Sequence, residues 1–140
     1  MLSGSRVLDE SNSRRYRSRP DVYKFAVFEW RAADYPLERG VEMFHGPHIK
    51  VRNGNGWYGV QLAVFFETHK CLPGHAHCYV KSVEVRAARV STPTAVRTSV
   101  GGSLEMAAQA LAGDFIVRNP KGEEYVMPAE EFLRRYDPVD

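Results

Sequence analysis

The chain has 140 residues, a formal net charge of +2, 44% hydrophobic residues and 11% aromatic residues. This length and apolar content suffice for one domain with a hydrophobic core, or for two very small units packed together. The longest apolar runs fall far short of the ~20 residues of a membrane span, and the amino terminus lacks a signal-peptide core. We therefore expect a cytoplasmic protein with no membrane partner and with two reduced cysteines.

Residues 1–20 are rich in serine and arginine and show no hydrophobic period. This composition predicts a flexible basic arm, followed by a single compact β-rich domain at residues 21–140. The charged side chains of the arm that could contact nucleic-acid phosphates are Arg14, Arg15, Arg17 and Arg19. Nucleic-acid binding through this arm is one alternative function, and a solvated tail is the other interpretation.

From Val22 onward the sequence is dense in β-branched and aromatic residues, which favour strands. The predicted strands are 22–30, 48–53, 57–67, 78–90, 94–100, 115–119 and 123–127. Glycine-containing turns at Gly54-Asn55-Gly56 and Pro120-Lys121-Gly122 predict two hairpins. Asp34-Tyr35-Pro36 is typical of a turn.

One helix is predicted with clear end signals, at the carboxyl terminus. Pro128 suits a first helical turn, and Glu130 and Arg134 suit the positive and negative ends of the helix dipole. Residues 103–112 are ambiguous, because propensity favours a short helix while the alanines also alternate as in a strand. We lean towards helix there.

The chain also contains a weak internal repeat. A shift of 66 residues places Val51-Arg52-Asn53 over Val117-Arg118-Asn119 and Phe66 over Phe132. Two copies of one unit, at residues 22–70 and 83–136, would share a core that neither could build alone. The alternative is two ordinary hairpins with the same turn chemistry.

These patterns together predict a mainly β (α+β) fold. We expect small barrel-like or sandwich-like β units, with a possible internal duplication and a carboxyl-terminal helix. Duplicated units often pack about a pseudo-twofold axis and leave edge strands exposed, so a homodimer is also possible.

The segment HKCLPGHAHC is the densest group of metal-ligand side chains, and it holds His69, Cys71, His75, His77 and Cys78. Pro73-Gly74 predicts a reversal of the chain within it. A loop of two or four residues would bring His69, Cys71 and Cys78 to one face, and a three-residue loop would bring His69, Cys71 and His77 together. Either set is compatible with a zinc site, and an exposed polar hairpin without metal is the other interpretation.

Two family resemblances bear on the same half of the chain. His75-Ala76-His77, followed by Gly113-Asp114 and Pro120-Lys121-Gly122, resembles the two metal-binding motifs of cupins, although Tyr125 replaces a histidine ligand. That resemblance implies a β-barrel and, as an outside alternative, a metalloenzyme.

The motif Gly113-Asp114-Phe115, followed by Gly122-Glu123-Glu124-Tyr125 and by Phe132 and Tyr136, resembles the small bacterial and phage domains of the PGDYG type. The resemblance covers roughly residues 79–138. It implies a compact β-rich module, often encoded by phages, and supplies no catalytic residues.

No catalytic constellation is recognisable in the sequence, so we predict a non-enzymatic binding or interaction module that recognises a protein or a small ligand. Aromatic residues suited to a recognition surface are Trp30, Trp57, Tyr58 and Tyr79. The alternatives are a metal-binding protein or metalloenzyme centred on residues 69–78, with zinc as the expected metal, and nucleic-acid binding through the arginine arm.

Overall fold

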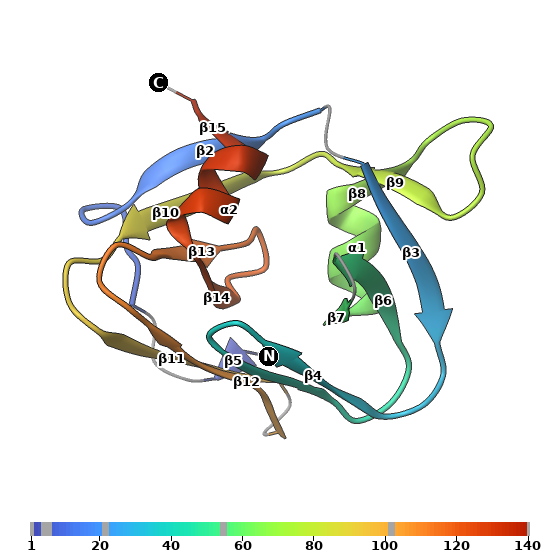
Figure 1. Ribbon diagram of the computed structural model, residues 1–140, viewed down its shortest axis with the longest axis horizontal. Helices are drawn as coiled ribbons and strands as arrows, with labels where there is room; N and C mark the ends of the chain where they lie inside the picture. The colour runs from blue at the N-terminus through green and yellow to red at the C-terminus, as the bar shows by residue number, and fades with distance from the viewer. Residues whose placement is uncertain (1, 4–6, 21–22, 54–55, 101–102, 140) are drawn as a thin grey trace.

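The computed structural model describes residues 2–3, 7–20, 23–53, 56–100 and 103–139 (Figure 1). Within these residues the protein is mainly β, with three antiparallel five-stranded sheets and two short helices. The predicted fold class is therefore confirmed at this level. Val22, the turn residues 54–55 and residues 1 and 4–6 of the predicted arm lie outside the described residues.

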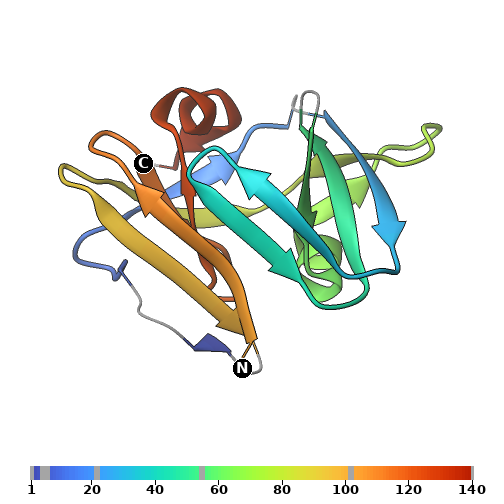
Figure 2. The same cartoon turned by 60° about the horizontal axis from the view of Figure 1, so that its bottom comes forward.

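The central sheet has the strand order β1-β11-β12-β5-β4. Its strands are β1 (Leu2–Ser3), β4 (Ala33–Leu37), β5 (Gly40–Phe44), β11 (Thr94–Val100) and β12 (Ser103–Ala110). The hairpins β4–β5 and β11–β12 lie side by side across the molecule, because β5 pairs with β12 (Figure 2). A Cβ atom at Gly40 would overlap the Ala107 carbonyl oxygen, so this pairing needs a residue without a side chain.

The β3 sheet, named after its middle strand, has the order β7-β6-β3-β9-β8. Its strands are β3 (Tyr23–Glu29), β6 (His48–Asn53), β7 (Gly56–Val60), β8 (His69–Cys71) and β9 (Cys78–Lys81). Helix α1 (Leu62–Thr68) connects β7 to β8.

The β10 sheet has the order β14-β13-β10-β2-β15. Its strands are β2 (Arg14–Ser18), β10 (Glu84–Arg89), β13 (Phe115–Arg118), β14 (Glu124–Met127) and β15 (Tyr136–Pro138). Helix α2 (Ala129–Arg135) connects β14 to β15, in the place that α1 has in the β3 sheet.

The β3 and β10 sheets exchange one strand each. β2 comes directly before β3 in the chain, yet it pairs with β10 and β15. β9 comes directly before β10, yet it pairs with β3 and β8. Each half of the chain therefore completes the sheet of the other half, which ties the two halves into one structure.

Both sheets build their core around a phenylalanine from the adjoining helix. Phe132 of α2 stacks on Tyr136, with ring centroids 4.9 Å apart, and Tyr16 of β2 meets it edge-on at 4.8 Å. In the β3 sheet Phe65 of α1 stacks on His69 at 4.3 Å, and Tyr79 of β9 meets it edge-on at 4.9 Å. Both phenylalanines are fully buried, and such ring pairs add stability beyond their buried area.

The two hairpins at β6–β7 and β13–β14 and the carboxyl-terminal helix are confirmed. Two other predictions are wrong. Residues 62–68 form α1 instead of continuing a strand, because Val64, Phe65 and Thr68 fall on one buried helical face. Asp34-Tyr35-Pro36 lies inside β4 and not in a turn.

The flexible arm is also wrong for residues 14–18, which form β2 with Tyr16 and Ser18 buried. The helix favoured at 103–112 is instead β12, because β11 and β5 pair with it on its two sides. Ladder hydrogen bonds to two neighbours outweigh the small helix preference of the alanines there.

The internal repeat has an offset of 66 residues only in the first strand of each hairpin, β6 and β13. Val51 and Val117 face Tyr58 and Tyr125 of the following strands, so the offset becomes 67 beyond the turn. The residue of α1 that corresponds to Phe132 is therefore Phe65, and placing Phe66 there is wrong.

Candidate functional site

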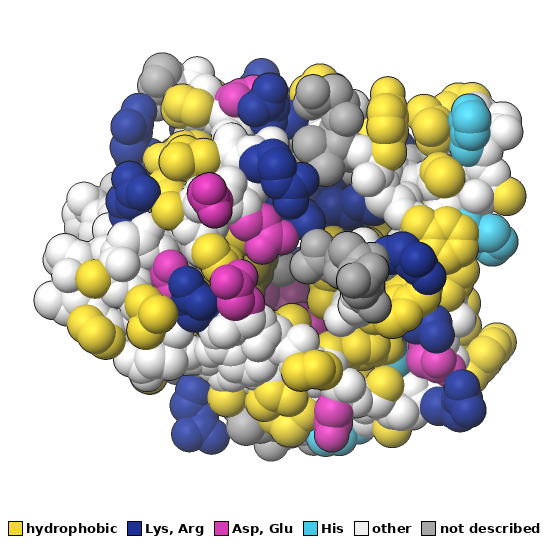
Figure 3. Space-filling model, in the orientation of Figure 1, with side chains coloured by type: hydrophobic (Ala, Val, Ile, Leu, Met, Phe, Trp, Pro, Cys, Tyr) yellow, Lys and Arg dark blue, Asp and Glu magenta, His cyan; other side chains and the backbone are white. Residues whose placement is uncertain are grey.

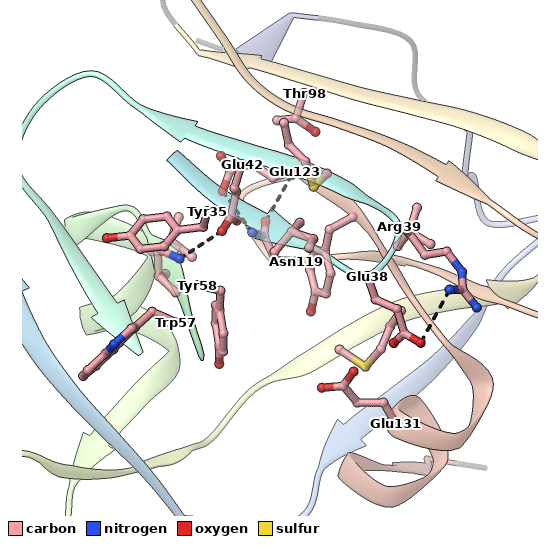
Figure 4. Close-up of a pocket in the computed structure, with 18 of the residues that line it drawn as sticks. Tyr35, Glu38, Arg39, Glu42, Trp57, Tyr58, Thr98, Asn119, Glu123 and Glu131 are labelled. Atoms are coloured by element: carbon pink, nitrogen blue, oxygen red, sulfur yellow. Dashed lines mark hydrogen bonds and ion pairs between the residues drawn. The ribbon is translucent and has the colours of Figure 1, made fainter. Parts of the chain in front are cut away.

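A cleft of about 590 Å³ lies between the β3 sheet and the β10 sheet. Its lining comes from both halves of the chain, including β3, β4, β7 and α1 from one half and β14, α2 and β15 from the other. Figure 4 shows Trp57 and Tyr58 on one side of this space and Glu38, Arg39 and Glu131 on the other.

The polar centre of the cleft consists of lysines and tyrosines from five strands. Lys24 of β3 donates a hydrogen bond to the hydroxyl of Tyr58 over 2.9 Å. Lys81 at the end of β9 donates to the hydroxyls of Tyr136, over 2.6 Å, and Tyr125, over 3.3 Å. The strand alternation explains the convergence, because each of these residues occupies an inward position of its sheet. We call Lys24, Tyr58, Lys81, Tyr125 and Tyr136 the lysine–tyrosine cluster.

Positive charge is concentrated around this cluster. Burial lowers the pKa of Lys24 well below its usual value, and repulsion from Lys81 and Arg135 lowers it further. Burial alone would raise the pKa of Tyr136, but the two lysine charges bring it below its ordinary value. The pKa of Tyr58 is raised, chiefly by burial.

Glu131 is one of six acidic residues that line the cleft, and it pairs with one of these cations. Glu131 of α2 forms an ion pair with Arg135 over 2.9 Å, one helical turn away. Lys24, Lys81 and Arg135 together with Glu131 carry a formal charge of +2 (three positive minus one negative), while the rest of the lining holds Arg39 and five further acidic residues, Asp34, Glu38, Glu42, Glu123 and Glu124. A buried excess of positive charge is costly unless an anion offsets it.

The remaining lining of the cleft combines apolar side chains with acidic groups. The apolar part includes Leu37, Met106, Val126 and Met127. Glu42 accepts a hydrogen bond from the Gly59 N–H over 2.9 Å, and Glu123 accepts one from Asn119 over 3.0 Å. Burial raises the pKa of Glu123. Figure 3 shows acidic and basic side chains around a recess near the middle of this face.

His69 lies beside the cluster and is held in its neutral form. Its Nδ1 lies 2.8 Å from the Thr68 hydroxyl, and its buried Nε2 has no hydrogen-bond partner among the described residues. Burial lowers the pKa of His69 to about 2, with added repulsion from Lys24 and Lys81. The imidazole is therefore neutral at physiological pH and packs as an aromatic ring against Phe65.

The residues predicted to bind metal are spread along the β8–β9 hairpin. Cys71 pairs with Tyr79 and His69 with Lys81, so the loop between the strands spans residues 72–77 and both registers expected from the sequence are wrong. His69 is buried, His75 and His77 are exposed, and Cys71 and Cys78 are free thiols. In the described part of the chain, no three His, Cys, Asp or Glu side chains are placed to hold a metal ion.

The predicted nucleic-acid arginines lie on or beside β2. Arg15 and Arg17 alternate with the buried Tyr16 and Ser18 and face outward. Arg15 forms an ion pair with Glu84 over 3.2 Å, and Arg19 approaches Asp137 at 4.0 Å. The structure therefore fixes these side chains on a sheet, next to acidic neighbours.

The sequence pointed to Tyr58 as a recognition residue, but the other four members of the lysine–tyrosine cluster were not predicted. Tyr58 and Tyr125 gave one usable signal, because each follows a predicted hairpin turn at a corresponding position. Nothing local distinguishes Lys24 or Lys81 from surface lysines, since the exchange of β2 and β9 is what brings them to the cleft.

The chain matches no family model, no curated protein and no solved structure. The structure explains the glycine and aspartate of the carboxyl-terminal motif by folding alone. Gly113 has a φ of 94°, and Asp114 is buried in an ion pair with Arg39 over 2.7 Å. Among the described residues no helix has the length and apolar character to cross a membrane.

Proposed function

We propose that this protein is a non-enzymatic binding module whose cleft takes a small ligand that carries an anionic group. The observation that carries the proposal is the grouping of three cations at the lysine–tyrosine cluster, where Lys81 and Arg135 both repel Lys24 and Glu131 pairs with Arg135. A carboxylate or phosphate there would accept charge-assisted hydrogen bonds from the two ammonium groups.

The apolar walls indicate the rest of the ligand. Small-molecule sites are mostly apolar clefts with a few polar groups that fix the orientation of the ligand, and the volume of about 590 Å³ suits a molecule of that kind. Leu37, Met106 and Val126 would contact an apolar or aromatic body, while the cluster holds the anionic head.

Binding would be linked to proton uptake. The pKa of Lys24 is depressed by burial and by neighbouring cations, and an anion beside the amine would raise it. The complex therefore binds more protons than the free protein near that pKa, so the affinity increases as the pH falls.

Benzoate and benzyl alcohol provide a test, because they have a similar shape and differ in charge. We expect millimolar benzoate to raise the midpoint of thermal unfolding by several degrees and benzyl alcohol to leave it unchanged. Inorganic phosphate serves as a second probe, which tests the anionic group without an apolar body.

Lys24→Met and Lys81→Met should each abolish the benzoate effect. Lys24→Met should also stabilise the free protein, because it removes a buried amine from the field of Lys81. Lys70→Met, on the exposed side of β8, is the matched control and should keep the benzoate effect. Equal shifts with benzoate and benzyl alcohol, or an unchanged response in both cleft variants, would refute an anion site.

We also propose that the chain contains two copies of one β unit, and that the cleft lies between them. The proposal is supported by the shared strand order of the β3 and β10 sheets, by the matching positions of α1 and α2, and by the equivalent ring sets around Phe65 and Phe132. Lys24 corresponds by register to Val85 and Lys81 to Ser18. On this proposal the copies diverged at the cluster: the first half supplies Lys24 on β3, the second half supplies Lys81 on the exchanged strand β9, and neither counterpart is a lysine.

Membership of the PGDYG-type group, a phage origin, a zinc ion at residues 69–78 and a homodimer stay predictions from the sequence.

A further inference from the structure

The outer face of the β3 sheet carries an open aromatic surface, on the side opposite to the lysine–tyrosine cluster. Tyr23 and Phe25 are 61% and 41% exposed, although hydrophobic side chains of this size usually lie in a core. We call the set Tyr23, Phe25, Lys50, Arg52 and Trp57 the aromatic face. Figure 3 shows hydrophobic side chains next to Lys, Arg and His over the part of the molecule where β3 and β9 lie in Figure 1.

Rings and cations alternate on this surface. Phe25 and Trp57 have ring centroids 6.2 Å apart. Lys50 places its Nζ 4.9 Å from the centre of the Trp57 ring, and Arg52 places its guanidinium carbon 5.1 Å from it. These cation–π contacts hold two positive charges at the Trp57 ring.

The surface is electropositive as well as aromatic. Among the described outward positions of the strands in this sheet, the one acidic residue is Glu29, at the far end of β3. Glu29 forms ion pairs with Lys50 over 3.4 Å and with Arg31 over 3.4 Å. Lys70 adds a further exposed cation on β8.

The corresponding face of the β10 sheet is occupied by the chain itself. Arg86 donates hydrogen bonds to Ser13, and Arg118 donates to the carbonyl oxygen of Leu8. Phe25 corresponds by register to Arg86, so exposed rings are a property of the β3 sheet alone. The exposed rings are therefore not a feature that both sheets share.

We propose that the aromatic face binds single-stranded nucleic acid, with bases stacked on Phe25 and Trp57 and phosphates beside Lys50 and Arg52. A sheet surface with exposed rings and flanking cations suits unpaired bases, because every base has a stacking face and every nucleotide carries one negative charge. Trp57 also lines the cleft, but Tyr23, Phe25, Lys50 and Arg52 do not, so this inference does not rest on the ligand proposed for the cleft.

The test uses the full chain with Trp30→Phe, which leaves Trp57 as the one tryptophan. A fifteen-nucleotide oligo-dT and the matching oligo-U are titrated at low salt, and Trp57 fluorescence is followed. We expect quenching by both, and an affinity that falls with salt with a logarithmic slope of about −2, as for three neutralised phosphates on a single strand. An abasic oligomer of the same length should bind at least tenfold more weakly.

Variants are compared by the anisotropy of a labelled oligo-dT. Phe25→Ala should weaken binding at least about fivefold, and Tyr23→Ala serves as a second ring variant because that side chain is the more exposed. Lys50→Gln combined with Arg52→Gln should reduce the salt slope by about 1.4. Arg15→Gln combined with Arg17→Gln, on the outer side of β2, is the matched control and should leave affinity nearly unchanged.

Three results would overturn the proposal. The abasic oligomer could bind as tightly as oligo-dT, or the Arg15 and Arg17 variant could lose affinity while the ring variants keep it. The third is a Trp57 fluorescence intensity that changes with protein concentration but not with added oligonucleotide. That result would assign the surface to binding a second copy of the chain. None of these three results would contradict the anion site in the cleft, which is tested separately with benzoate.

Discussion

Replacement of His69 by phenylalanine tests how the fold holds a neutral imidazole next to two lysines. The native protein keeps the pKa of His69 at about 2, mainly by burial, against an ordinary value of 6.5. The unfolded chain therefore binds one more proton than the folded chain at pH values between these two. The stabilising effect of the neutral ring is fully present above pH 6.5 and is lost as the pH falls below it.

The size of the effect follows from the pKa difference. Each pH unit below 6.5 costs about 1.4 kcal/mol, so wild-type protein should lose about 3 kcal/mol at pH 4.5 through this residue. His69→Phe keeps the stacking on Phe65 and removes the titration. The substitution loses the hydrogen bond with Thr68 and also removes the unpartnered Nε2. We therefore expect the free energy of unfolding at pH 7.5 to change by no more than about 1–2 kcal/mol.

The assay is denaturant unfolding of both proteins at pH 7.5 and pH 4.5, followed by tryptophan fluorescence. Between the two pH values the stability of His69→Phe relative to wild type should rise by about 3 kcal/mol. His75→Phe, on the exposed loop, is the matched control and should differ from wild type by less than about 0.5 kcal/mol at both. If the free energy of unfolding changed equally with pH in wild type and His69→Phe, the lowered pKa of His69 would be contradicted.

Two further predictions concern the contacts that join the halves of the chain. Gly40→Ala should destabilise the protein by at least about 1–3 kcal/mol in urea unfolding, because the new methyl group meets the backbone of Ala107, whereas Gly46→Ala, with open space around it, should be nearly neutral. Asp114→Asn should cost about 1–3 kcal/mol at pH 7, because it weakens the ion pair with Arg39. Burial raises the pKa of Asp114, but Arg39 and the Leu111 N–H bring it below its ordinary value. The stability difference between wild type and Asp114→Asn should therefore shrink as the pH falls through the folded pKa. A constant stability difference down to pH 2 would contradict this prediction.

Local signals were reliable where one short segment decides its own structure. Turn residues between apolar runs predicted the β6–β7 and β13–β14 hairpins. Pro128, the two following glutamates and the late arginines predicted α2. α1 has no acidic residue in its first turn and no basic residue in its last turn, and its apolar run is equally compatible with a strand.

The candidate site was beyond sequence reasoning because its residues come from distant parts of the chain. Lys24 and Lys81 contact tyrosines of β7, β14 and β15, and these contacts depend on which strands pair. The metal site predicted at residues 69–78 was based on the composition of that segment alone. The six-residue loop at 72–77 exposes His75 and His77, while His69 on β8 is buried.

The β-rich class, two hairpins and the last helix follow from local sequence, because turn chemistry and helix-end charges act over a few residues. Tertiary structure decided the exchange of β2 and β9, the strand form of residues 103–110 and the cleft. Strand pairing joins residues far apart in the chain, and its ladder hydrogen bonds and buried area outweigh local preferences of a few tenths of a kcal/mol per residue. The side chains that meet in the cleft are therefore set by pairing partners, which no single segment encodes.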